Sequence, residues 1–291
     1  MNDPRFEVVG VLTMPDAASW RGMKIKENIV WSYAKELWIA PEDIKKPHSL
    51  RSSSKKRSTE AVESYERLQE KQIDFLVVVA YWQILPKHIL ELPKIWPINV
   101  HGSLLPEYRG ASPLQTVFLD EKKETGVTIM VMDEGVDTGD MIDKKNVALP
   151  LSWTVKDLVK RIENETPSFL CDTLWEYGKW RLDRVSQDHQ ETTNTKKISK
   201  NDGLIVLTDT LQDVYRKYQA YALWPKVFFE YNKRVCTIDS LEVDAKQRES
   251  MKHQSWVNDA MKLNDAITSC MVKPSWKKAM TRDSFINGYM K

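Results

Sequence analysis

Apolar and polar positions along the chain predict strands and helices that follow one another in turn. Short apolar, β-branched runs predict strands at residues 6–14 (FEVVGVLTM), 73–82 (IDFLVVVAYW), 96–103 (WPINVHGS) and 125–133 (TGVTIMVMD). Polar stretches with spaced apolar residues predict helices at 59–72, 86–94 and 152–180, and Thr154 with Asp157 forms a predicted capping box for the third. Strands that alternate with helices predict an α/β fold, Rossmann-like, with a mainly parallel sheet.

The pattern changes after residue 185. Residues 186–203 are polar and indicate a linker, which divides a domain at 1–185 from a smaller C-terminal domain at 204–291. Within the C-terminal domain the sequence predicts a helix at 210–221 and a hairpin at 226–239 that turns near Asn232 and Lys233. Residues 247–269 look helical.

Composition narrows the class of protein. Of the 291 residues, 42% are apolar and 29% are charged, which is the balance of a globular domain with a core. The net charge of +2 is too small to require an anionic partner. Cys171, Cys236 and Cys270 show no CxxC spacing, which argues against a disulfide framework or a zinc site and indicates reduced thiols. No apolar run is long enough to span a membrane, and the first residues do not read as a signal or transit peptide.

Polar side chains follow the predicted strand in INVHGSLLPEYRG. Asn99 and His101 lie two residues apart and share one face of that strand, at the sheet edge where ligands bind in α/β folds. A second polar loop, DEGVDTGDM, follows the next strand and brings four acids that can meet the histidine: Asp133, Glu134, Asp137 and Asp140.

Asparagine, histidine and aspartate together suit chemistry at a carbonyl carbon, because amide and imidazolium donors stabilise an oxyanion. No GxSxG motif is present, so direct attack by a substrate nucleophile is favoured over a covalent intermediate. A second interpretation stays open from these residues alone. His101 is then a structural histidine and Asp137 a turn residue.

Longer motifs carry a resemblance. VVVAYWQILP, INVHGSLLPEYRGASPLQ and ETGVTIMVMDEGVDTGDMI resemble the formyltransferase superfamily that uses 10-formyltetrahydrofolate. SQDHQETTNTKKISKNDGLI, WKKAMTRDSFING and TMPDAASWRGMKIK resemble the linker, C-terminal end and basic loop of the methionyl-tRNA formyltransferase family. The resemblance implies transfer of a formyl group from 10-formyltetrahydrofolate to the α-amine of initiator methionyl-tRNA, without a metal, and an OB-like barrel as the C-terminal domain.

The resemblance also implies roles for individual residues. Asn99, His101 and Asp137 match the catalytic trio, with Asn99 and His101 stabilising the oxyanion and Asp137 keeping His101 protonated. The implied folate pocket is formed by Tyr81, Ile84, Ser103, Leu104, Leu105, Pro106 and Asp140, although Leu105 also reads as plain core. The implied tRNA contacts are Arg21, Lys24, Lys26, Lys196 and Lys200, with Lys197 beside them.

Two departures from the family pattern qualify these expectations. The chain starts later than the family does, without a first strand and helix, which suggests a mis-assigned or truncated start and a mitochondrial matrix enzyme, with a bacterial cytoplasmic one as the alternative. No glycine lies between Gly203 and Gly288, which puts the barrel in doubt. We expect a monomer. The alternatives are a formyltransferase for a small amine such as an amino-sugar nucleotide, and a non-catalytic relative that binds RNA or folate.

Overall fold

The computed structural model describes residues 3–18, 25–50, 59–206, 208–244, 246, 251–252, 254–256 and 266–289, and in the strands 17–18 and 25–26 the backbone only. The chain forms two compact units that interleave along the sequence. The first unit comprises 1–101, 127–145 and 166–191, and the second comprises 102–126, 146–165 and 192–291. The predicted boundaries at residues 185 and 203 stay predictions.

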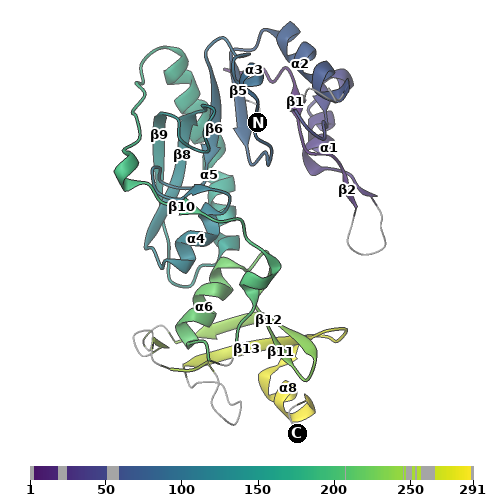
Figure 1. Ribbon diagram of the computed structural model, residues 1–291, viewed down its shortest axis with the longest axis vertical. Helices are drawn as coiled ribbons and strands as arrows, with labels where there is room; N and C mark the ends of the chain where they lie inside the picture. The colour runs from purple at the N-terminus through teal and green to yellow at the C-terminus, as the bar shows by residue number, and fades with distance from the viewer. Residues whose placement is uncertain are drawn as a thin grey trace. The chain divides into compact units, whose positions relative to one another are not determined.

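A four-stranded sheet carries the polar motifs (Figure 1). Its order is β5-β6-β8-β9, with β5 at Phe75–Val79, β6 at Trp96–His101, β8 at Glu124–Val131 and β9 at Met141–Ala148. β5 and β6 are parallel, and β6 and β8 are antiparallel. The three strands predicted for this region are confirmed, and the α/β, Rossmann-like class with them.

Helices and apolar side chains stabilise the first unit. The C-terminal part of α5 (Val155–Gly178) supplies Leu170, Leu174 and Tyr177 to a core shared with Ile98 and Ile129 of the sheet. A second cluster forms where α3 (Lys87–Leu90) meets the preceding loop, and α2 (Thr59–Lys71) contributes Tyr65 to it. All three predicted helices are present. At the start of α5 the Asp157 carboxylate accepts hydrogen bonds from the backbone N–H and hydroxyl of Thr154, both at 2.8 Å.

The N-terminal segment differs from the prediction. The expected strand at 6–14 shrinks to β1, Val11–Leu12, because its parallel partner β4 spans only Ile44–Lys45 and no longer ladder forms. Val8 is accordingly 52% exposed. A short antiparallel pair follows, β2 (Ala17–Ala18) with β3 (Ile25–Lys26), and then α1, Ile29–Glu36, and the 3₁₀ turn η1, Pro41–Asp43.

The second unit is built on an antiparallel sheet. Its order is β11-β12-β13-β14, with strands at Phe228–Tyr231, Arg234–Val243, Ile267–Pro274 and Met280–Thr281. The predicted hairpin is confirmed: Tyr231 pairs with Arg234, and Asn232 and Lys233 between them have φ of 46° and 61°, as a two-residue hairpin turn requires. Ile267–Ser269 lie in β13, so the helical expectation for 247–269 is wrong there, while 247–250, 253 and 257–265 lie outside the described residues.

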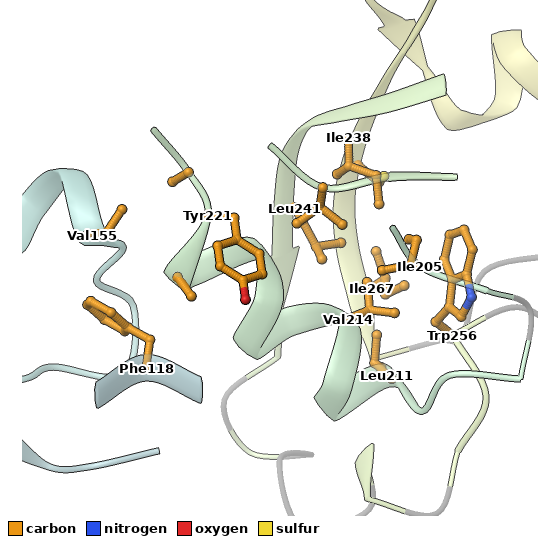
Figure 2. Close-up of a cluster of buried hydrophobic side chains, with 14 of the residues drawn as sticks. Phe118, Val155, Ile205, Leu211, Val214, Tyr221, Ile238, Leu241, Trp256 and Ile267 are labelled. Carbon is orange, nitrogen blue, oxygen red and sulfur yellow. The ribbon is translucent and has the colours of Figure 1, made fainter. Parts of the chain in front are cut away.

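Helices complete this unit. α4 (Pro113–Leu119) packs on α6 (Leu211–Ala220), which is the helix predicted at 210–221, and α8 (Arg282–Tyr289) ends it. Phe118, Tyr221, Ile238 and Trp256 belong to one continuous apolar core (Figure 2). The remaining elements are short: β7 (Arg109–Gly110) parallel to β10 (Asn194–Thr195), η2 (His189–Glu191) and η3 (Lys200–Gly203).

Among the described residues, no helix is long and apolar enough to cross a membrane. The three cysteines are buried and free, as predicted.

Candidate active site

Asn99 and His101 lie at the carboxyl end of β6. Ile98 and Val100 pack on the apolar core of the first unit, so alternation along the strand turns Asn99 and His101 to the other face. The two polar residues are opposite Met130 and Thr128 of the antiparallel neighbour β8. The His101 side chain is only 6% exposed, which places its imidazole in a largely dry environment.

The loop between β8 and β9 is held in one conformation by its own side chains. The Asp133 carboxylate accepts hydrogen bonds from the backbone N–H of Gly135 at 2.9 Å and from the hydroxyl of Thr138 at 2.6 Å. Gly139 passes so close to β8 that an added Cβ would lie 1.9 Å from the carbonyl oxygen of Val131. Asp137, between these anchors, adopts φ of +54°, a left-handed conformation that aspartate tolerates better than most residues.

Asp137 is the acid of this loop that meets the histidine. Its Oδ1 accepts a hydrogen bond from Asn99 Nδ2 at 3.3 Å and lies 3.6 Å from His101 Nδ1. One carboxylate oxygen therefore contacts both polar side chains of β6. The predicted trio converges, and its geometry offers two donors, one of them ionisable, beside a fixed negative charge.

The other three acids of the loop serve different contacts. Asp133 stabilises the turn as described. Glu134 lies 3.5 Å from the amine of Lys87, with both side chains exposed. Asp140 accepts a hydrogen bond from the hydroxyl of Ser186 at 2.9 Å and lies 3.8 Å from the guanidinium of Arg184.

Gln187 supports the loop from a segment that the sequence pattern marked only as linker. Its buried amide donates to the backbone carbonyls of Asp137 at 3.0 Å and Gly139 at 2.7 Å. No local signal in the sequence identifies this residue, because its partners lie about fifty positions away.

The predicted folate residues fall into two groups. In the first unit, Ile84 is 57% exposed, while Tyr81 packs against the cluster around α3. The Tyr81 hydroxyl is buried without a hydrogen-bond partner among the described residues, and burial raises the pKa of Tyr81 to about 12. In the second unit, Leu105 and Ser103 are fully buried, and the Ser103 hydroxyl donates to the carbonyl of Glu107 at 2.6 Å. Leu104 and Pro106 are partly buried there.

The predicted tRNA contacts are described only in part. Arg21 and Lys24 lie outside the described residues, and for Lys26 the backbone alone is described. Lys196, Lys197 and Lys200 are exposed. Within the part of the chain that the structure describes, no three His, Cys, Asp or Glu side chains are grouped to hold a metal ion.

Comparisons with known proteins bear directly on this arrangement. Residues 2–174 match the family described as Formyl transferase, and residues 197–290 match Formyl transferase, C-terminal domain. The Methionyl-tRNA formyltransferase of Nitratiruptor sp. is 33% identical over 98% of this chain and 90% of its own length. That of Natranaerobius thermophilus is 31% identical over 96% and 88%.

Solved structures agree in fold. Methionyl-tRNA formyltransferase from Clostridium thermocellum superposes with a TM-score of 0.54 at 17% identity, covering 86% of this chain and 92% of its own. HypX from Aquifex aeolicus in complex with tetrahydrofolic acid gives 0.55 at 13% identity, covering 75% and 39%. With both domain matches in sequence order and two curated relatives aligned almost end to end, this chain belongs to the formyl transferase family of enzymes.

Proposed function

We propose that this formyl transferase moves the formyl group of 10-formyltetrahydrofolate to the α-amine of methionine esterified to initiator tRNA. The observation that supports this reaction is the shared contact of Asp137 Oδ1 with Asn99 and His101. The relatives named above support the substrate, because each carries the name Methionyl-tRNA formyltransferase.

The proposed reaction is a direct acyl transfer. The amine nitrogen attacks the formyl carbon, and the carbonyl electrons move onto oxygen to give a tetrahedral oxyanion. We assign its stabilisation to the Asn99 amide and to Nε2 of His101, since Nδ1 of the imidazole faces the Asp137 carboxylate. The C–N bond to the folate then breaks, and the proton lost by the amine passes to the folate nitrogen.

The Tyr81 hydroxyl supports a folate pocket on the first unit. A buried donor without a described partner costs free energy, and a heteroatom of a bound folate would satisfy it. Ile84 adds exposed apolar surface three residues further along the chain. We retain Ser103, Leu104, Leu105, Pro106 and Asp140 as folate candidates, and Arg21, Lys24, Lys26, Lys196 and Lys200 as tRNA candidates.

The decisive experiment measures transfer of labelled formyl from 10-formyltetrahydrofolate to charged initiator tRNA. Uncharged tRNA, free methionine and an amino-sugar nucleotide serve as alternative acceptors. Label on methionyl-tRNA alone is the expected result. Label on the sugar would replace the acceptor with a small amine, and no transfer by a folded sample would leave the non-catalytic interpretation.

The compartment and the oligomeric state are finer proposals. We keep the mitochondrial matrix beside the cytoplasm of a bacterium, and the relatives named above come from bacteria, which supports the second. Imaging of a tagged chain in the source organism separates them. We also keep the monomer, which light scattering at working concentration tests.

A further inference from the structure

Two lysines of the second unit line one small cavity. Lys156 lies in the first turn of α5, and Lys226 lies between α6 and β11. The cavity has a volume of about 10 Å³, and Tyr218, Tyr221 and Asp239 contribute to its lining. Figure 2 labels Tyr221 and Ile238, which line this cavity, and Val155, which precedes Lys156 in the chain.

The charges around the Lys226 amine are out of balance. Burial lowers the pKa of Lys226, and the positive charge of Lys156, together with a side-chain hydrogen bond from it, lowers the pKa further. Lys273 acts in the same direction, and Asp239 opposes the other charges with a smaller effect than Lys156. Neither Lys156 nor Lys226 forms an ion pair with any described carboxylate within 4.0 Å. Three amines and one carboxylate thus give this site a local positive excess, which a bound anion would reduce.

The backbone conformation at Lys226 is also unfavourable. Its φ is +75°, a left-handed value that glycine adopts more readily than lysine. The adjacent backbone at the end of α6 fixes this conformation, because the Lys226 N–H donates to the carbonyl of Tyr221 at 3.1 Å. The Lys226 carbonyl also packs on Gly203, where an added Cβ would lie 2.0 Å from it. A long cationic side chain therefore occupies a strained position opposite a like charge, a combination typical of functional sites.

We propose that Lys156 and Lys226 together bind a phosphate group, supplied by the backbone of the tRNA. The choice of tRNA as the source of the phosphate rests on the proposed function. The binding of an anion by the two lysines does not. A cavity of this volume admits one water-sized group, so one phosphate oxygen lies between the amines while the rest of the diester stays outside. Lysine amines suit phosphate as point charges with several donors, and the first turn of α5 adds positive potential.

The test uses two matched substitutions. Lys226→Gly removes the amine and relieves the left-handed strain. Lys233→Gly does the same at the β11–β12 turn, where the lysine is exposed, has φ of 61° and lies outside the cavity. Both variants should melt at or above the wild-type temperature, because glycine suits these angles. Only Lys226→Gly and Lys156→Ala should weaken binding of uncharged tRNA, by about 3- to 10-fold, and reduce the slope of log affinity against log salt by about one contact.

Inorganic phosphate separates the two sources of the anion. It should raise the melting temperature of the wild type and of Lys233→Gly more than that of Lys226→Gly. Phosphate protection without a change in the tRNA salt slope would overturn the RNA assignment and leave a site for free phosphate. If Lys226→Gly keeps both wild-type tRNA binding and the wild-type response to phosphate, the proposed site is wrong. Because uncharged tRNA binding needs no turnover, this outcome is distinct from a failure of formyl transfer.

Discussion

The side chain of Gln187 holds the backbone of Asp137. Its amide nitrogen donates to the Asp137 carbonyl at 3.0 Å and to the Gly139 carbonyl at 2.7 Å, and the residue is buried. Gln187 thus fixes the backbone that carries the Asp137 carboxylate, although the two residues lie fifty positions apart in the sequence. Gln187 is a positioning residue, since it touches the backbone of the candidate site and acts through Asp137.

Gln187→Ala should lower kcat by about tenfold and the free energy of unfolding by about 1–2 kcal/mol, because it leaves one buried and one partly buried carbonyl without this donor. KM for the folate should change little. Gln190→Ala, at an exposed position three residues on, is the control and should match the wild type in both measurements. An unchanged kcat in a Gln187→Ala protein of lowered stability would make the residue purely structural.

Asn99→Ala, His101→Ala and Asp137→Asn should each reduce kcat by about 100- to 1000-fold, the usual effect of losing an oxyanion donor or the charge that orients it. Affinity for tRNA should persist, as measured by filter binding. Glu134→Gln lies on the same loop in an exposed contact with Lys87 and should keep full activity. Wild-type turnover in any trio variant would remove that residue from the mechanism.

Tyr81→Phe distinguishes a folate contact from plain packing. Removing a buried hydroxyl that has no described partner should raise the melting temperature of the free protein. If the hydroxyl binds folate, KM for 10-formyltetrahydrofolate should rise about 3- to 10-fold at the same time. Tyr33→Phe, at a half-exposed position in α1, should change neither quantity. A raised melting temperature with an unchanged KM would assign Tyr81 to the core alone.

Gly139→Ala should unfold the site loop, because the new Cβ would meet the Val131 carbonyl at 1.9 Å and the backbone must move. We expect a loss of about 1–3 kcal/mol in the free energy of unfolding, together with most of the activity. Gly288→Ala in α8 meets nothing within 4 Å and should be neutral or slightly stabilising. Urea denaturation compares the two, and equal midpoints would contradict the close approach.

Asp43 links stability to pH in the first unit. Burial alone would raise the pKa of Asp43, but hydrogen bonds from Lys71 and Arg67, both 2.6 Å long, outweigh it and hold the pKa below the ordinary value of 3.8. A pKa lowered by folding contributes stability above the unfolded value, and this contribution is lost as the pH falls through the folded value.

Asp43→Asn should therefore cost about 1–3 kcal/mol at pH 7, and the difference from wild type should shrink as the pH falls below about 4. Glu42→Gln changes the exposed neighbouring carboxylate and should leave the pH profile as it is. Melting curves from pH 3 to 8 measure both. If the stability difference between the wild type and Asp43→Asn stays constant down to pH 3, the titration of Asp43 is not its cause.

The sequence correctly predicted the elements that are determined by their own residues. The apolar run before Asn99 and His101 gave β6, and the hairpin turn at Asn232 and Lys233 followed from residues that tolerate positive φ. The strand expected at 6–14 failed because its length depends on a distant partner, β4, which is only two residues long.

The candidate site divides in the same way. Alternation placed Asn99 and His101 on one face, and loop composition supplied four acids of which Asp137 is the one in contact with both. The choice of Asp137 depended on the conformation of the turn made by Asp133, Gly135 and Thr138, which their identities alone do not fix. It depended also on Gln187, which lies outside any local sequence window.

A single oxygen atom, Oδ1 of Asp137, contacts both Asn99 and His101. The energetic effects of changing these three residues are therefore coupled, and double variants should lose far less than the product of the single losses. A chain that changes one of the three gains little by keeping the other two. Over evolutionary time the trio should behave as one inherited character, retained whole or abandoned whole.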